Sequence, residues 1–405
     1  MVELEQALER LLGSATFSLR GEMVPLLDSM GKLCEQDLFS PMEQPPFPMA
    51  RADGYAVRAE DIRGADENHP VSLELLGTVY AGTPSEQIVG VGQALRITEG
   101  AVIPEGADCI VDALYTDCST ETEVSVYSSA FYQQNIQLPG DEVEKGQFVL
   151  RKWERIGAPQ IGLLAGLGIL TVPVYKPLKV GILTTGAEIV DPHYPLEPGK
   201  IYDMNASMLR ARVESLGMTP VVVNQPVGDD VAQTCSIISA ILPQVDILLT
   251  TGGVSLGKQD LITQVYTELG VSPLFEGVNF WPGFQTFAGK LGRKIILSLS
   301  GSPAACILSF DLLVRPLCAK MSGERNTGLK TTVATFQGEM ESNEPITVTR
   351  FYFAEYEMGT NTVRVPRGNV RPGGLLRASE SNCFLEIPKG VKNLQDGNPV
   401  RVILL

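Results

Sequence analysis

Histidine and closely spaced cysteine are scarce in this sequence of 405 residues. It holds 2 His and 7 Cys, and no two cysteines form a CxxC pair. Zinc sites and disulfide frameworks use these residues at short, regular spacings, so neither is predicted. We expect the cysteines to be free thiols in small buried positions, as in the reducing cytoplasm.

Long apolar runs and an excess of positive charge are also missing. The longest apolar stretch, residues 161–174, is interrupted by three glycines and a proline, and it is shorter than the roughly 20 residues of a membrane span. The start, MVELEQALERLL, reads as an amphipathic helix with acidic residues, unlike a signal peptide. The net charge of -15 disfavours nucleic acid and anionic membranes as partners. We therefore expect a cytoplasmic protein with small-molecule ligands.

The length and the changes of pattern along the chain predict several domains. Residues 1–44 read as helix, turn, helix, and residues 147–174 return to the same elongated helical and β domain. Residues 45–146 carry short β-runs and turns, which predict an inserted β-domain. Strands and helices alternate over residues 175–327, and β-runs return over residues 328–405. The predicted fold class is a multidomain α/β plus β protein with a central doubly wound parallel sheet.

Three predicted strands of the central domain end in turns of small residues. In an open parallel sheet, ligands bind at the carboxyl ends of the strands, where glycine lets the backbone approach an anion. Such turns also serve packing alone, but three at one sheet edge favour a phosphate-binding site. The candidate ligand-binding residues in these turns are Thr185, Gly186, Gly252, Gly253, Ser255, Gly257, Gly301 and Ser302.

Three carboxylates, those of Glu188, Asp203 and Asp260, are expected near the same edge. Acidic side chains beside a phosphate site commonly coordinate Mg²⁺, which bridges the like charges. The alternative for each is a helix cap or a solvated loop position, and Asp260 directly precedes a predicted helix. We predict these three as metal-binding and catalytic residues and leave the cap role open.

The same turns carry a family resemblance. The segment TTGGVSLGKQD at 250–260 is similar to the signature of molybdopterin-binding domains. Further segments resemble, in the same order, the molybdenum insertases, which include the MoeA-type proteins and the C-terminal domain of gephyrin. These segments are ADGYAV at 52–57, RITEGAVIPEGAD at 96–108, PGDEVEKG at 139–146, TTGAEIV at 184–190, IYDMN at 201–205 and SGSPAA at 300–305.

The resemblance implies a four-part fold: an elongated segment, an inserted β-domain, a molybdopterin-binding α/β domain and a C-terminal β-barrel. It also implies a homodimer whose active site lies between the α/β domain of one subunit and the inserted domain of the other. The implied reaction is insertion of molybdate into adenylylated molybdopterin, with Mg²⁺-dependent release of AMP. By the same resemblance, Asp53 joins the ligand-binding residues and Glu142 the catalytic ones.

The chain departs from the family pattern where cations are expected. Trp281 and Phe284 stand where the family has two lysines, and Gln137 lies where its sequence is rich in arginine. The two aromatic rings fit either stacking on a pterin or purine or ordinary packing, while Arg51 is a new cation that could return one charge. Three hypotheses remain. The first is a molybdenum insertase, and the second is a catalytically degenerate paralogue that carries or regulates a pterin, nucleotide or finished cofactor. The third is an enzyme for a different oxyanion or a related cofactor, such as a tungsten form.

Overall fold

The computed structural model describes most of the chain. The described residues are 1–16, 20–118, 120–223, 230–252, 261–324, 327–341, 345–366 and 374–405. Across these ranges, every helix is too short or too polar to traverse a lipid bilayer.

The chain forms two compact units. The larger unit comprises Met1–Glu22 and Tyr175–Leu405, and the smaller unit comprises Met23–Val174. The first helix, α1 (Leu4–Ser14), belongs to the larger unit, because Ala7 and Leu11 are buried in the same core as the central sheet. The sequence pattern groups this helix with residues 147–174, whereas the structure places it in the larger unit. The finer division into four domains stays a prediction.

The larger unit is built on a sheet of six strands. The first four strands of this sheet run parallel to one another. The strand order is β16 (Thr219–Val222), β13 (Lys179–Thr184), β17 (Ile247–Thr251), β21 (Lys294–Leu299), β20 (Phe287–Leu291) and β18 (Ser272–Glu276). The last two strands join antiparallel. Only two residues connect β20 to β21, too few for the crossover that a parallel pair requires.

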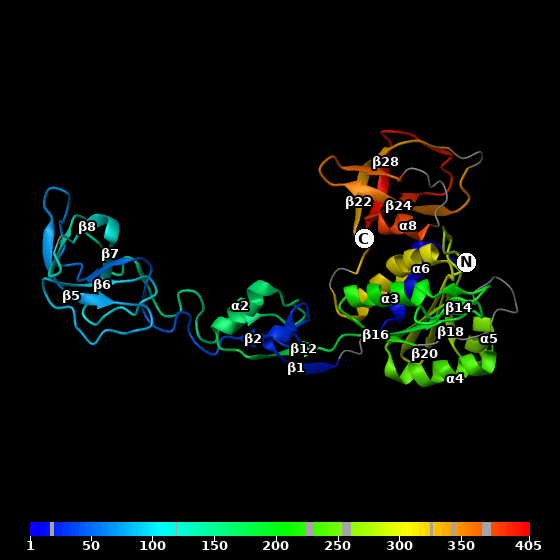
Figure 1. Cartoon of the computed structure of the whole chain (residues 1–405), viewed down its shortest axis with the longest axis horizontal. Helices are drawn as coiled ribbons and strands as arrows, with labels where there is room; N and C mark the ends of the chain where they lie inside the picture. Colours follow the sequence, from blue (N-terminus) through cyan, green and yellow to red (C-terminus); the bar gives the residue numbers. More distant parts are fainter. Residues whose placement is uncertain are drawn as a thin grey trace. The chain divides into compact units, whose positions relative to one another are not determined.

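Helices cover both faces of this sheet, as the doubly wound prediction requires (Figure 1). Along β17, Ile247 and Leu249 face one core, while Leu248 faces the other. The first core includes α1, α3 (Met204–Ser215) and the helical run of α6 (Pro303–Ser309), the π-helix η4 (Phe310–Val314) and α7 (Arg315–Met321). The second core includes α4 (Val231–Ile241) and α5 (Leu261–Glu268).

A closed β-barrel follows at the end of the chain, which confirms the expectation from the resemblance. Its strands are β24 (Thr349–Glu357), β25 (Thr362–Arg364), β22 (Thr331–Gln337), β28 (Pro399–Leu404) and β26 (Cys383–Ile387), drawn orange to red in Figure 1. The pairing of β24 with β26 closes the ring. A short strand from the α/β part, β19 (Phe280–Trp281), adds to β24 in parallel, so the barrel is joined directly to the loop that carries Trp281.

The smaller unit contains a second sheet of six strands, as predicted for the inserted β-domain. Their order is β7 (Cys109–Asp112), β4 (Gly54–Val57), β6 (Gln93–Ile97), β5 (Val71–Val79), β9 (Glu123–Val126) and β8 (Thr116–Asp117). The remaining part of this unit holds α2 (Ala158–Gly166), and β2 (Leu38–Phe39) paired with β11 (Phe148–Leu150).

The second helix that we predicted within residues 1–44 is wrong. The chain there forms β1 (Gly21–Pro25), one 3-10 turn η1 (Leu26–Ser29) and β2. Pro25 and Gly31 leave too few residues between them to nucleate a stable α-helix.

Candidate active site

The three small-residue turns of the α/β part meet at one edge of the sheet. Thr184, Thr251 and Leu299 lie in register at the carboxyl ends of β13, β17 and β21. A Cβ added at Gly252 would lie 2.1 Å from the carbonyl oxygen of Thr185, and Gly252 has a φ of +88°. Only glycine fits there without a backbone shift. A Cβ at Gly301 would lie 3.5 Å from the Cα of Gly252, so the backbones of these turns come into close contact.

Hydrogen bonds fix the turns to one another. The Thr185 amide donates to the Thr251 carbonyl at 2.9 Å, and the Thr251 hydroxyl donates to the Ser300 carbonyl at 3.0 Å. Asn205 Nδ2, at the start of α3, donates to both Thr251 Oγ1 at 2.8 Å and the Gly301 carbonyl at 2.9 Å. Sequence reasoning missed Asn205 as a site residue, although it closes the IYDMN segment. Its side chain joins the turns after β17 and β21, which the sequence alone does not place together.

Two of the three predicted carboxylates lie at this edge. Asp203 is buried and caps α3: its Oδ1 accepts from the Ala206 amide at 2.9 Å, and its Oδ2 accepts from the Thr184 hydroxyl at 2.6 Å. Glu188 is exposed and lies next to Gly186, since a Cβ added there would be 2.8 Å from Glu188 Oε2. The cap role of Asp203 is therefore real, and each of its oxygens keeps a second lone pair for a cation.

A complete metal site cannot be assembled from the described residues. Among them, no group of three His, Cys, Asp or Glu side chains could hold an ion. The oxygen chemistry of Glu188 and Asp203 suits Mg²⁺. Asp260, the third predicted ligand, lies outside the described residues, as do Gly253, Ser255 and Gly257. Ser302 directly precedes α6, and its amide donates to Ser300 Oγ at 3.3 Å.

A second group of motif residues converges in the smaller unit. Asp53 Oδ1 accepts from the Glu99 amide at 2.8 Å, which joins the ADGYAV and RITEGA segments. Arg51, which directly precedes ADGYAV, forms an ion pair with Asp141 of PGDEVEKG at 3.1 Å. The new cation therefore already has a carboxylate partner. Glu142, next to Asp141, is exposed.

Arg350 from the barrel stacks on Trp281. The guanidinium carbon lies 5.6 Å from the ring centroid, a cation–π contact. This contact covers one face of the indole, which favours packing for Trp281 over the stacking on a ligand that we considered. Sequence reasoning missed Arg350 because the two residues lie far apart in the chain and meet only through the pairing of β19 with β24.

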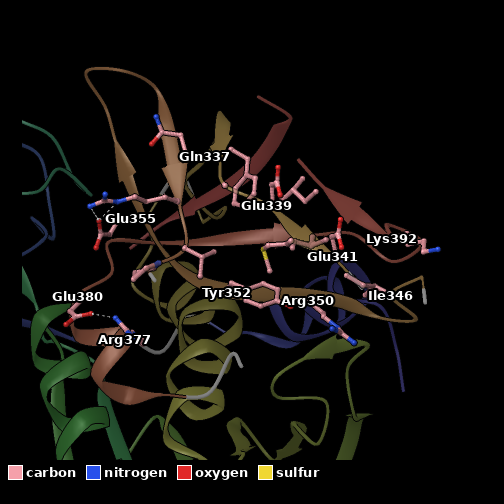
Figure 2. Close-up of a pocket in the computed structure, with 18 residues that line it drawn as sticks. Gln337, Glu339, Glu341, Ile346, Arg350, Tyr352, Glu355, Arg377, Glu380 and Lys392 are labelled. Carbon is pink, nitrogen blue, oxygen red and sulfur yellow. Dashed lines mark hydrogen bonds and ion pairs between the residues drawn. The ribbon is translucent and has the colours of Figure 1, made fainter. Parts of the chain in front are cut away.

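Arg350 also lines a cavity of about 1010 Å³ in the barrel (Figure 2). At the opposite end of the cavity, Arg364 pairs with Glu355 at 2.6 Å and Arg377 pairs with Glu380 at 3.2 Å. Within the described part of the chain, Arg350 has no carboxylate partner. Arg350 thus lies between the cavity that it lines and the indole of Trp281.

Cys306 lies beneath the sheet edge and is unsuited to nucleophilic chemistry. It is fully buried, and burial raises the pKa of its thiol to about 12. A thiol with this pKa stays neutral at physiological pH, whereas only the thiolate is an effective nucleophile. Cys306 therefore supplies no nucleophile to the site.

Comparisons with known proteins agree with this geometry. The family model described as "MoeA N-terminal region (domain I and II)" matches residues 2–168, and "Probable molybdopterin binding domain" matches residues 181–320. A Bacillus subtilis protein named molybdopterin molybdenumtransferase is 32% identical over 387 residues, covering 95% of this chain and 90% of its own. A protein of that name from Staphylococcus epidermidis is 30% identical over 403 residues, covering 100% and 95%.

Solved structures give the same result. The crystal structure of a molybdopterin biosynthesis MoeA protein from Pyrococcus horikoshii superposes with a TM-score of 0.83 at 31% identity, over 100% of this chain and 99% of that one. The closed barrel and the three converging turns are thus accounted for together. The chain belongs to the MoeA family.

Proposed function

We propose that this protein is a molybdopterin molybdenumtransferase, which inserts molybdate into adenylylated molybdopterin and releases AMP. One observation carries the proposal: the backbones after β13, β17 and β21 converge at one sheet edge, with Gly252 in close contact with Thr185. Backbone N–H groups at such an edge hold phosphate without a full positive charge. The relatives that match nearly the whole chain carry this transferase name.

The predicted residues take separate roles in this proposal. Thr185, Gly186, Gly252 and Gly301 bind the pterin phosphate, together with Gly253, Ser255, Gly257 and Ser302. Glu188, Asp203 and Asp260 hold Mg²⁺, which when bound neutralises the charge on the phosphates. Asp53 and Glu142 act from the inserted domain of the second subunit of a homodimer.

The oxyanion needs a cation, and Arg350 supplies it in this proposal. The resemblance places a lysine at position 281, where this chain has an indole. A guanidinium that packs on this indole places positive charge beside the vacated position. Guanidinium groups bind tetrahedral oxyanions through two parallel hydrogen bonds.

The carrier alternative is not favoured. Its support was the loss of the family lysines, and Arg350 offsets part of that loss. The full-length matches to transferases also leave no domain unaccounted for.

The decisive experiment is release of AMP by the purified protein from adenylylated molybdopterin with Mg²⁺. We expect release that depends on molybdate. Tight binding of the pterin nucleotide without release would support the carrier alternative, and tungstate that far outperforms molybdate would support the tungsten form.

A further inference from the structure

The loop that carries Trp281 is tied to the α/β part at its base. It spans residues 277–286 and joins β18 to β20. The Gly277 amide donates to the Thr286 carbonyl at 3.0 Å, which closes the base of the loop. Between these two residues the chain turns, and β19 pairs there with β24 of the barrel. The position of Trp281 therefore depends on the contacts that hold this turn.

Two buried hydroxyl groups hold the turn against the helix α6. Thr286 Oγ1 donates to the Gly283 carbonyl at 2.7 Å and lies 3.0 Å from Ser309 Oγ. Thr286 and Ser309 are both 0% exposed. Because the hydroxyl hydrogen of Thr286 goes to the Gly283 carbonyl, Ser309 is the donor of the second bond. The helix thus supports the turn through Thr286.

The backbone of the turn also lies directly on this helix. A Cβ added at Gly283 would be 2.7 Å from Ser309 Oγ and 2.6 Å from the ring of Phe280, and Gly283 has a φ of +120°. Only glycine fits there without displacing a neighbour. Gly283 lies two residues after Trp281, so a movement of the turn away from Ser309 would move the indole as well.

We propose that Thr286 and Ser309 are positioning residues for the oxyanion cation. They fix the turn at Gly283, the turn fixes the indole of Trp281, and this indole holds the guanidinium carbon of Arg350 at 5.6 Å from its centroid. The inference rests on the proposed function, in which Arg350 binds molybdate. It assigns to Thr286 and Ser309 no contact with the substrate.

The chain offers graded variants and a matched control. Thr286→Val keeps the branched shape of the side chain and loses both hydroxyl bonds, whereas Ser309→Ala keeps the bond from Thr286 to Gly283. The control is Thr234→Val in α4, on the opposite face of the sheet. It also removes a fully buried hydroxyl that donates to a backbone carbonyl, that of Asp230, at 2.6 Å. A role in stability alone predicts similar effects of the two threonine-to-valine changes.

The KM for molybdate in AMP release separates positioning from stability. We expect Thr286→Val to raise this KM about threefold to fivefold, which corresponds to the loss of one typical hydrogen bond, and Ser309→Ala to raise it less. Thr286→Ser keeps the hydroxyl and should keep the wild-type KM, as should Thr234→Val. The dissociation constant of the pterin nucleotide should stay constant in all four variants.

A double-variant cycle tests whether Thr286 acts through Arg350. In an Arg350→Gln background, Thr286→Val should raise the KM little further, because the guanidinium that the turn positions is already absent. Effects of the two changes that multiply independently would overturn the inference. A KM that rises as much in Thr234→Val as in Thr286→Val would overturn it too.

Tryptophan fluorescence reports on the turn without any turnover. The sequence holds 2 Trp, so in a Trp153→Phe background the emission comes from the half-buried Trp281. We expect Thr286→Val to shift this emission and Thr234→Val to leave it unchanged, and Ser309→Ala serves the same comparison if Thr286→Val folds poorly. An emission that none of these changes shifts would overturn the inference. Wild-type protein that releases no AMP with molybdate would instead contradict the proposed function, and the emission would still test the turn.

Discussion

At the scale of single residues, a few close contacts shape the candidate site. Gly252 is required by the carbonyl of Thr185, Asp203 is held by Thr184 and the start of α3, and Arg350 lies on Trp281. The first two were predictable from local sequence, because a glycine after a buried strand indicates a tight turn and an acidic residue before a helix indicates an N-cap. The third was not, since no local pattern links a barrel arginine to a distant indole.

Arg350→Gln tests the proposed oxyanion cation. The variant keeps a polar side chain of similar length and loses the charge. We expect the KM for molybdate to rise about tenfold or more, because a hydrogen bond to a charged group contributes about 1.5–3 kcal/mol and a tenfold change corresponds to about 1.4 kcal/mol. The dissociation constant of the pterin nucleotide should change little. Steady-state AMP release over a molybdate titration measures both the KM and kcat.

The matched control for this change is Arg401→Gln, also in the barrel. Arg401 pairs with Glu386 at 3.0 Å and does not line the cavity, so its KM for molybdate should stay at the wild-type value. A KM that rises equally in both variants would mean that the barrel is merely perturbed.

The cysteines provide a pH-dependent prediction. Burial raises the pKa of Cys109, Cys306, Cys318 and Cys383 to about 12. Unfolded thiols ionise near pH 8.5. The free energy of unfolding therefore keeps the contribution of the buried neutral thiols below that pH and loses it as the pH rises toward 12.

Thiol labelling tests which cysteines are accessible. At pH 8, a thiol reagent should react rapidly with exposed Cys118, and Cys118→Ser should remove the fast phase. Fast labelling that persists in this variant would show that another thiol, either the part-buried Cys235 or a buried one, is accessible.

At the scale of elements, α3 and the π-helix η4 are joined by a buried ion pair. Arg212 donates from Nε at 3.0 Å and from Nη2 at 2.6 Å to Asp311 Oδ1, and Asp311 is 1% exposed. Burial raises the pKa of Asp311, and Arg212 opposes that rise. Since α3 also carries Asp203 and Asn205 at its other end, this pair helps to fix the helix that caps the site.

Arg212→Met should therefore destabilise the larger unit by about 3 kcal/mol, because it removes the hydrogen-bonded partner of the buried Asp311 carboxylate and leaves only the charge of Arg315 near it. The pKa of Asp311 would rise further, so the loss should be greater at pH 8 than at pH 4, where the carboxyl can bind a proton. Thermal unfolding at the two pH values measures the difference.

The double variant Arg212→Met with Asp311→Leu removes both charges and should recover most of the stability. If the single and double variants unfold at the same temperature, the ion pair does not fix α3 in the way described here.

The sequence predicted most strands and helices of the α/β part, but not the direction of every strand or the π-helix. The α/β alternation from residue 180 onward marked β13, β17, β21 and the helices on both faces correctly, because buried strands and amphipathic helices have distinct periods. It did not mark β20 and β18 as antiparallel, since the direction of a strand depends on the length of a connection rather than on its composition. The π-helix η4 also has no local signature in the run from Pro303 to Met321.

At the scale of the whole molecule, the family resemblance predicted more than the physical pattern did. Composition and periodicity indicated several domains, and the resemblance added the closed barrel that β24 and β26 complete. Neither the composition and periodicity nor the resemblance predicted that α1 packs in the larger unit. Its apolar stripe shows that one face is buried, but nothing in residues 1–16 shows that Ala7 and Leu11 pack with the central sheet.

A crystal of the protein soaked with adenylylated molybdopterin would show whether the three turns hold the phosphate. We expect phosphate oxygens within hydrogen-bond distance of backbone N–H groups in the turns after β13, β17 and β21, around Gly186, Gly252 and Gly301. A guest bound elsewhere, with these three turns empty, would contradict this expectation.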